Sequence, residues 1–180
     1  MSNEIEFDSD NLYYIKVSQS LVEDYLIMMN NPNINKYLSF KNRVFTYGNE
    51  LKWIDEKHKN NDIVFSIMEK GSNSFVGNIE VMEIKDNVAE IGVVITENMQ
   101  DKHYGSESIK RFVDYCLNEL KFDNIELSVY SHNLKAIHCY EKLGFVEYKR
   151  DKNVGMYDNI SIDDIYMKYM GKGVDLNEWK

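Results

Sequence analysis

The spacing of apolar residues predicts a strand, a loop and a helix over residues 87–120. Residues 88–96 are rich in β-branched side chains, which is typical of a strand. Farther along, apolar residues recur at the i, i+3, i+4, i+7, i+8 spacing of one buried helix face. They are Ile109, Phe112, Val113, Cys116, Leu117 and Leu120. The loop of residues 100–106 therefore enters a helix N-terminus, where unpaired N–H groups and the helix dipole favour a pyrophosphate.

Alternating and periodic patterns elsewhere predict the remaining strands and helices. Strands are expected over residues 12–17, 62–69, 75–84, 145–150 and 160–170. Helices are expected over residues 21–30 and 33–38, from Thr46 onward, and between Asn133 and Gly144. The strands over 62–69, 75–84 and 88–96 form a meander, and the last two strands close the sheet. We expect one domain over residues 1–180, since the chain has no Pro- or Gly-rich linker.

Composition narrows the classes of function. The net charge of −9 argues against nucleic acid as a partner, because phosphate binding needs basic clusters, and it is compatible with cationic amines. No apolar run approaches the ~20 residues of a membrane span, and the acidic first ten residues do not resemble a signal peptide. Cys116 and Cys139 suggest no disulfide framework. We expect a cytoplasmic protein with no membrane partner, and the four histidines show no spacing that indicates a metal.

Two sequence blocks resemble the GNAT superfamily of acyl-CoA-dependent N-acyltransferases. The family motif Gln/Arg-x-x-Gly-x-Gly/Ala is matched by Gln100-x-x-His103-x-Gly105, with histidine in place of the first glycine. The second block runs from Asn133 to Phe145 and is similar to the family pattern Asn-x-x-Ala-x-x-x-Tyr-x-x-x-Gly-Phe. Both blocks occur in the family's order after a plausible set of strands. The resemblance covers roughly residues 10–170 and is most specific over 88–148.

The resemblance implies a fold and an activity. The fold would be an α/β GNAT acyl-CoA N-acyltransferase fold, with a mixed, mostly antiparallel sheet of about seven strands flanked by helices. The activity would be transfer of an acetyl group from acetyl-CoA to a primary amine, of a protein N-terminus or a small molecule, by direct attack in a ternary complex. The segment of residues 30–38 resembles the branch of ribosomal-protein N-terminal acetyltransferases. The alternative is a non-catalytic acyl-CoA-binding module, suggested by His103 in place of glycine.

The resemblance also implies a set of coenzyme-binding residues. The loop would offer consecutive backbone N–H groups to the pyrophosphate, and its glycine would allow a close approach of the backbone. At residue 103 we expect dihedral angles that suit a residue other than glycine. Backbone groups of the preceding strand would bind the acetyl oxygen and the pantetheine arm. The expected residues are Val93, Ile95, Gln100, Asp101, Lys102, His103, Tyr104, Gly105, Ser106, Asn133 and Tyr140.

Tyr140 and Glu90 are the candidate catalytic residues. Tyr140 shares a helix face with Ala136 and Ile137, and its reference pKa of about 10 lets it hold a proton that a thiolate, with a thiol pKa of about 8.5, can accept. The alternative is a buried structural tyrosine. An alkylammonium must lose a proton before it attacks, and Glu90 is placed to accept it. Glu80, Glu83 and water are rival bases, and Glu90 is equally compatible with a surface carboxylate.

The expected acceptor pocket is less defined. The resemblance places the early helices around the acceptor, which makes Tyr37, Phe40 and Trp53 candidates to line the pocket. The alternative is that they are ordinary core aromatics. Cys139 is expected to pack and not to act as a nucleophile. A homodimer is plausible for the family.

Overall fold

The computed structural model describes residues 4–39 and 43–171, and within them it contains eight strands and five α-helices. The strands are β1 (Ile5–Asp8), β2 (Leu12–Lys16), β3 (Val64–Glu69), β4 (Phe75–Lys85), β5 (Val88–Ile95), β6 (Asn124–Tyr130), β7 (Phe145–Tyr157) and β8 (Ile160–Tyr169). The helices are α1 (Val22–Met29), α2 (Pro32–Asn35), α3 (Tyr47–Asn60), α4 (Tyr104–Asp114) and α5 (Leu134–Leu143). Short helical turns are η1 (Gln19–Leu21), η2 (Glu97–Met99) and the π-helical η3 (Tyr115–Glu119).

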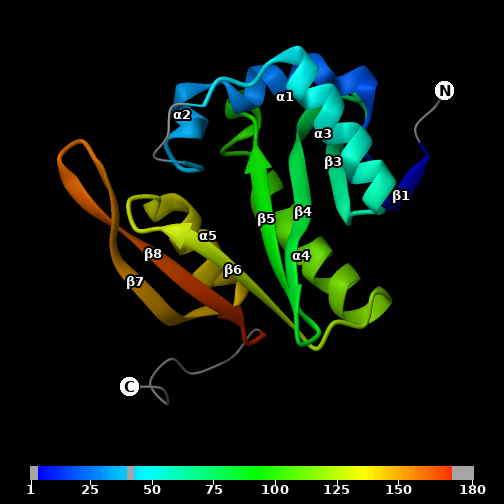
Figure 1. Cartoon of the computed structure of the whole chain (residues 1–180). Coiled ribbons are helices and arrows are strands. Elements are labelled where there is room, and N and C mark those ends of the chain that lie inside the picture. Colours follow the sequence, from blue (N-terminus) through cyan, green and yellow to red (C-terminus); the bar gives the residue numbers. More distant parts are fainter. Residues whose placement is uncertain (1–3, 40–42, 172–180) are drawn as a thin grey trace. The chain divides into compact units, whose positions relative to one another are not determined.

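The chain forms two compact units, which are drawn together in Figure 1. Unit 1 consists of Met1–Val81 and Gly92–Phe112, and unit 2 consists of Met82–Ile91 and Val113–Lys180. The elements β4, β5 and α4 run from one unit into the other. The single domain expected over residues 1–180 therefore stays a prediction.

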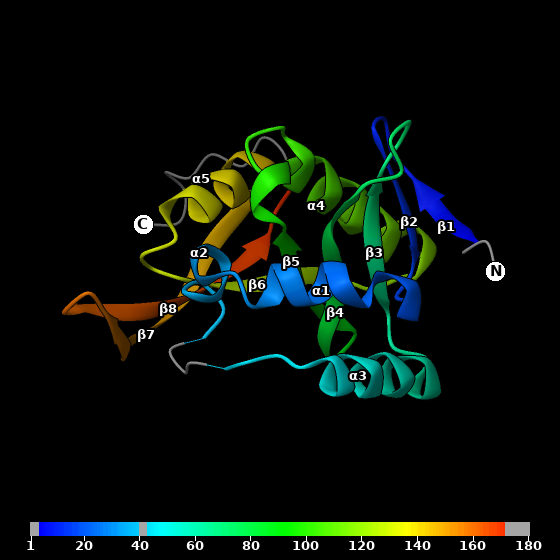
Figure 2. The same cartoon turned by 90° about the horizontal axis from the view of Figure 1, so that it is seen from above.

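Unit 1 is a sheet with helices on both faces. Its strands follow the order β1-β2-β3-β4-β5, and the first three pairings are antiparallel. Side chains of successive strand residues point to opposite faces. In β2, Tyr14 stacks on Phe7, which in turn stacks on Phe112 of α4, whereas Ile15 belongs to the core cluster formed with α1 and α3. Figures 1 and 2 accordingly show α3 and α4 on opposite sides of the strands β3 and β4.

Local capping explains where the helices of unit 1 begin. The side chain of Ser18 accepts a hydrogen bond from the N–H of Ser20 at the start of η1, which leads directly into α1. The Asn31 side chain caps α2, whose first residue is Pro32. Thr46 caps α3 as expected. The predicted helix over 33–38 starts one residue earlier and ends at Asn35.

Unit 2 is built on strands in the order β4-β5-β6-β8-β7. The pairing of β5 with β6 is parallel and runs over three residue pairs, from Val88–Asn124 to Glu90–Glu126. The pairs β6–β8 and β8–β7 are antiparallel. Helix α5 begins after Asn133, whose side chain accepts from the N–H of Ala136, and ends at Gly144 with a φ of 97°. Both ends of this helix are as predicted.

The structure confirms the fold class and corrects the strand count and the end of β7. Strand β1 was not predicted, because Phe7 is its only buried residue. Strand β7 was expected to end at Arg150 and continues to Tyr157 as one arm of a long hairpin with β8 (Figure 1). Its residues are mostly exposed, so no apolar alternation marks it in the sequence. In the described ranges no helix combines the length and the apolar character that crossing a membrane requires.

Candidate active site

The predicted phosphate loop leads into α4, which begins at Tyr104. Residues 104–106 were expected to belong to the loop. They form the first turn of α4 instead. The first bond along the helix runs from the N–H of Glu107 to the His103 carbonyl, at 3.0 Å. The N–H groups of the three preceding residues have no intrahelical acceptor and point toward the helix N-terminus. This arrangement favours an anion such as a pyrophosphate.

The backbone of the loop is left-handed at two residues. His103 has a φ of 64° and Asp101 has a φ of 63°. Residue 103 thus has the left-handed conformation that glycine adopts most readily, although the residue here is histidine. Histidine and aspartate are among the residues other than glycine that tolerate this region best, at a cost of about 1–2 kcal/mol. The loop keeps the glycine-like geometry although the first glycine of the motif is missing.

Several side chains of the loop and of the first turn of α4 contact the surrounding protein. The Gln100 amide donates to the Ile95 carbonyl at 3.1 Å, and the Tyr104 hydroxyl donates to the carboxylate of Glu69. The ammonium of Lys102 lies 3.4 Å from the Met99 sulfur. These contacts hold the loop in place, so its backbone is the part best suited to bind a ligand. A β-carbon on Gly105 would meet only Ile95 Cγ1, at 3.5 Å, so the protein itself leaves room for a larger residue there.

Strand β5 leads into this loop. Val93 and Ile95 are half-buried in the part of the strand that belongs to unit 1. The ladder with β6 ends at Glu90, five residues before the end of β5. At its far end, the N–H of Thr96 donates to the Val76 carbonyl at 2.9 Å. The strand is thus anchored at both ends, with Val93 and Ile95 between the anchors.

Tyr140 and Asn133 lie in unit 2, on α5 and at its N-terminus. Tyr140 is buried, with 9% of its surface exposed, and its ring packs 6.1 Å from that of Phe145. Burial raises the pKa of the Tyr140 phenol well above its ordinary value, so this hydroxyl keeps its proton at neutral pH. The Asn133 side chain is engaged in capping, at 3.3 Å from the N–H of Ala136. Cys139 is half-buried, and burial raises the pKa of its thiol, in keeping with a packing role.

Glu90 is half-buried on β5 within unit 2. Its carboxylate accepts a hydrogen bond from the Ser128 hydroxyl at 3.2 Å. Burial raises the pKa of Glu90, and the negative charges of Glu83, Asp164 and Glu126 raise it further. A raised carboxyl pKa brings a base closer to neutral pH, where proton transfer is most efficient. Glu90 is thus more than a freely solvated surface carboxylate.

The rival bases are placed differently. Glu80 forms an ion pair with Lys57 at 2.8 Å, and Lys57 also lies 3.4 Å from Asp62. The Glu80 carboxylate is thus already engaged with a cation of the protein. Glu83 is exposed on β4. The structure therefore favours Glu90 among the three carboxylates that the sequence suggested.

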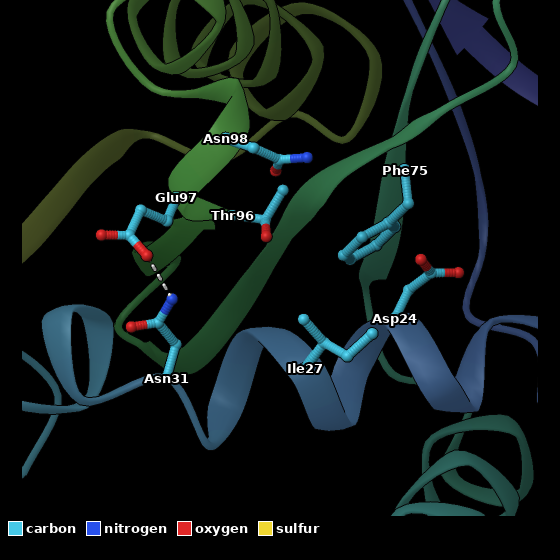
Figure 3. Close-up of a pocket in the computed structure, with 7 residues that line it drawn as sticks. All are labelled: Asp24, Ile27, Asn31, Phe75, Thr96, Glu97 and Asn98. Atoms are coloured by element: carbon cyan, nitrogen blue, oxygen red, sulfur yellow. Dashed lines mark hydrogen bonds between the residues drawn. The ribbon is translucent and has the colours of Figure 1, made fainter.

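A pocket with a volume of about 270 Å³ lies within unit 1 (Figure 3). It is lined by Asp24 and Ile27 of α1, by Asn31 at the start of α2, by Phe75 of β4, and by Thr96, Glu97 and Asn98 after β5. Two carboxylates thus face a small cavity whose walls are partly apolar. Such a cavity suits a small ligand that carries both methylene groups and positive charge.

Comparison with known proteins decides the family. A protein-family profile described as "Acetyltransferase (GNAT) domain" matches residues 11–146. The chain belongs to the GNAT acetyltransferase family. The match spans both motif blocks and most of the described chain, so the resemblance inferred from the sequence is confirmed. It makes the chain an N-acetyltransferase, an enzyme that transfers an acetyl group to an amine.

Individual GNAT proteins show how similar this chain is to its relatives. A spermidine N(1)-acetyltransferase from Vibrio cholerae is 31% identical over 121 residues, which are 66% of this chain and 69% of that protein. The L-amino acid N-acetyltransferase AaaT from Escherichia coli is 28% identical over 83 residues, which are 46% of this chain and 51% of AaaT. A solved structure of spermidine N-acetyltransferase from Vibrio cholerae, in complex with CoA and spermine, has a TM-score of 0.80 at 24% identity. It covers 89% of this chain and 95% of its own, and shows that the fold is shared.

Of the aromatic residues predicted for the acceptor pocket of this GNAT domain, Trp53 and Tyr37 do not line the cavity. Trp53 packs edge-to-face on Tyr25 at 5.8 Å, in the core cluster of unit 1. Tyr37 is half-buried next to Lys36, and Phe40 lies outside the described residues. Sequence reasoning missed the two carboxylates of the pocket, Asp24 and Glu97. They are 73 positions apart in the sequence and share no motif. The only sequence signals are that Asp24 lies in a predicted helix and that Glu97 lies close to the predicted loop.

The residues predicted for catalysis and coenzyme binding divide between the two units. Unit 1 holds the loop, the start of α4, and Val93 and Ile95. Unit 2 holds Glu90, Asn133 and Tyr140. Within the described residues, no group of three or more His, Cys, Asp or Glu side chains is arranged to hold a metal ion.

Proposed function

We propose that this GNAT domain transfers the acetyl group of acetyl-CoA to the primary amine of a small aliphatic molecule. The observation that carries the proposal is the start of α4, where three consecutive N–H groups follow a left-handed loop. Such a helix N-terminus suits the pyrophosphate of coenzyme A. Relatives support the same direction, since one is a spermidine acetyltransferase and one structure with this fold is in complex with CoA and spermine.

The coenzyme would be held mainly by backbone groups. We assign the pyrophosphate to the N–H groups of Tyr104, Gly105 and Ser106, and the acetyl and pantetheine groups to the backbone of Val93 and Ile95. The left-handed geometry at His103 supports the first assignment, because it turns the chain into the helix as glycine would. The early end of the β5–β6 ladder supports the second. Gln100, Asp101, Lys102 and Asn133 would shape or flank the site.

The chemistry moves three protons: the ammonium loses one before it attacks, the nitrogen loses a second to water as the amide forms, and the leaving thiolate gains one. The amine nitrogen attacks the thioester carbonyl carbon, the carbon–sulfur bond breaks, and the acetyl group moves to nitrogen. We assign to Glu90 the removal of the ammonium proton, directly or through water, and to Tyr140 the donation of a proton to the leaving thiolate. The raised pKa of Glu90 supports its role, because Glu90 is then a better base, and the buried Tyr140 phenol stays protonated until the thiolate forms. The raised phenol pKa also makes Tyr140 a weaker acid, so its assignment rests on its place in the family motif and not on its pKa.

The test combines acetyl-CoA binding with thiol release. Calorimetry is expected to show one acetyl-CoA site per chain with a micromolar dissociation constant, and thiol release is expected with spermidine or another aliphatic amine. Tyr140→Phe should lower kcat by roughly 10²-fold or more while acetyl-CoA affinity stays unchanged. Tyr169→Phe is the matched control, because Tyr169 packs on the same Phe145 ring at 5.3 Å.

Three results would contradict the proposal. Normal acetyl-CoA binding with no thiol release across a broad amine panel would instead support the non-catalytic alternative. Absence of binding at millimolar acetyl-CoA would remove the assigned coenzyme site. Equal losses in Tyr140→Phe and Tyr169→Phe would reduce Tyr140 to a packing residue.

A cytoplasmic location and a homodimer stay predictions from the sequence.

A further inference from the structure

The pocket in unit 1 has negative charge at two places and apolar surface between them. Figure 3 shows Glu97 and Asp24 on opposite sides of the cavity, with Ile27 between them and Phe75 beside Asp24. Its volume of about 270 Å³ lies just below the roughly 300–1,000 Å³ typical of sites for drug-sized ligands. The pocket therefore suits a thin chain more than a bulky ring system.

Glu97 is held in one orientation by two side-chain amides. The Asn31 amide donates to Oε2 at 2.6 Å, and the Asn33 amide donates to Oε1 at 2.7 Å. The Asn31 side chain is itself fixed, because its oxygen accepts from the N–H of Asn33 at 2.9 Å. A carboxylate accepts about four hydrogen bonds, so each oxygen keeps one position for another donor. These two amides form a clamp that orients Glu97 and leaves two acceptor positions of its carboxylate open.

The electrostatics at both ends favour a bound cation. Hydrogen bonds from Asn31 and Asn33 lower the pKa of Glu97, so its carboxylate is charged at neutral pH. Burial raises the pKa of Asp24, and the neighbouring charge of Glu23 adds to this. Within residues 4–39 and 43–171, no cation is paired with Asp24. A positive ligand would relieve this half-buried charge.

We propose that the pocket recognises the acceptor as a di- or polyamine, and that Glu97 binds an ammonium group that is not acetylated. An ammonium has three donors, and two of them can fill the two open acceptor positions of the clamped carboxylate. Asp24 supplies the second negative charge, and Ile27 and Phe75 contact the methylene chain. This assignment rests on the proposed N-acetyltransferase activity and makes Glu97 a specificity-determining residue of that reaction.

The decisive experiment compares two substrates of equal chain length. Thiol release is measured with 1,5-diaminopentane and with 1-aminopentane, which replaces the distal ammonium by a methyl group. The wild-type enzyme is expected to prefer the diamine in kcat/KM. Glu97→Gln should reduce this preference by roughly 10- to 100-fold, the range for one charge-assisted hydrogen bond, through a higher KM for the diamine. The KM of the monoamine should stay unchanged.

Two further variants separate the clamp from net charge. Asn33→Ala should reduce the preference by less than Glu97→Gln does, because the charge remains and only its orientation loosens. Glu56→Gln is the matched control, since Glu56 is an exposed carboxylate on α3 that pairs with the exposed Lys52, at 3.7 Å. It removes the same formal charge and should leave the preference intact. Added salt should weaken the wild-type preference.

The outcomes distinguish this inference from the proposed function. Equal kcat/KM for the two amines, or an unchanged preference in Glu97→Gln, would overturn the inference while leaving acetyl transfer in place. If no amine releases thiol, calorimetric titration with the diamine alone shows whether the pocket binds a diamine. Binding that is lost in Glu97→Gln would support the pocket although the proposed function had failed, and absence of diamine binding would refute both.

Discussion

The backbone of Gly77 lies directly against the carbonyl group of Val94. A β-carbon on Gly77 would lie 2.0 Å from the Val94 oxygen and 3.0 Å from the α-carbon of Ile95. Real contacts never come so close, so only glycine allows β4 and β5 to approach in this way. The register of β3 with β4 also shifts here, between Ile67 and Met68. Gly77 therefore sets the position of the β5 segment that carries Val93 and Ile95.

Substitution of Gly77 by alanine should disturb both stability and coenzyme binding. The added methyl group forces the strands apart, and overpacking of this kind costs about 1–3 kcal/mol. Chemical denaturation should show this loss, and calorimetry should show weaker acetyl-CoA binding, because Val93 and Ile95 are displaced. Gly48→Ala on α3 is the control: its β-carbon meets nothing within 4 Å, and alanine should stabilise the helix by about 0.5–1 kcal/mol. An unchanged affinity in Gly77→Ala would disprove the positioning role.

Elements whose chemistry is local could be predicted from the sequence. Helix α5 has an asparagine cap, a periodic apolar face and a closing glycine, and all three act within one or two turns. The buried strands β3 and β5 carry enough β-branched and aromatic residues to be recognised. For the same reason the loop and Tyr140 were found as candidates, since each lies in a contiguous motif.

Features that depend on distant contacts could not be predicted. Strand β7 is largely exposed, and its pairing with β8 and not an apolar pattern keeps it extended to Tyr157. The pocket joins Asp24 of α1 to Glu97 after β5, and only the folded sheet brings them to one cavity. The close approach of Gly77 to Val94 is likewise a contact that exists only in the folded structure. No window of sequence contains either relationship.

The left-handed backbone at His103 predicts how substitutions there should behave. Glycine accepts a φ of 64° without strain, so His103→Gly should keep the free energy of unfolding or raise it by up to about 1 kcal/mol. Its acetyl-CoA affinity should stay within a few-fold of the wild type, because the N–H groups of α4 remain. Valine, which is branched at the β-carbon, is poorly tolerated at positive φ. His103→Val should therefore lose both stability and affinity.

Asp101→Gly is the matched control for His103, since Asp101 has nearly the same φ of 63° in the same loop. Both glycine variants should respond alike in denaturation experiments. A large loss of acetyl-CoA affinity in His103→Gly alone would mean that the imidazole itself binds the coenzyme. That result would assign the histidine a chemical role that its backbone conformation does not require.

Glu107 of α4 fastens the turn between β1 and β2. Its carboxylate accepts hydrogen bonds from the Ser9 hydroxyl at 2.6 Å and from the Asn11 N–H and amide at 2.8 and 3.0 Å. Glu107→Ala should destabilise the protein by about 1–3 kcal/mol, because these donors lose a charged acceptor. Asp10→Asn, an exposed change in the same turn, should have little effect on the free energy of unfolding.

The contribution of Glu107 should depend on pH in a defined direction. Burial acts to raise its pKa, but the hydrogen bonds from Ser9 and Asn11 lower it overall. A carboxyl group with a lowered pKa in the folded state stabilises above its unfolded pKa of about 4.5, and this stability is lost as the pH falls through the folded value. The difference in free energy of unfolding between wild type and Glu107→Ala should therefore be largest near pH 7 and shrink below pH 4. A pH-independent difference would argue against the charge as its source.

Glu90→Gln should raise stability and lower activity at the same time. Burial raises the pKa of Glu90, so its contribution to stability is fully present below the unfolded pKa of about 4.5 and is lost as the pH rises through the folded value. At pH 8 the ionised Glu90 carboxylate destabilises the folded state, and glutamine removes its charge. The melting temperature of Glu90→Gln should therefore exceed that of the wild type. The kcat should fall by roughly 10²-fold or more if Glu90 is the base.

Glu80→Gln should give the opposite result and serves as the control. Glu80 pairs with the half-buried Lys57, so its loss should cost up to about 1 kcal/mol of stability with little change in kcat. For the wild type, kcat/KM should rise with pH through the raised pKa of Glu90, and this limb should vanish in Glu90→Gln and persist in Glu80→Gln. Full activity in Glu90→Gln would transfer the role of base to water, because Glu80 is engaged in an ion pair with Lys57 and Glu83 is exposed.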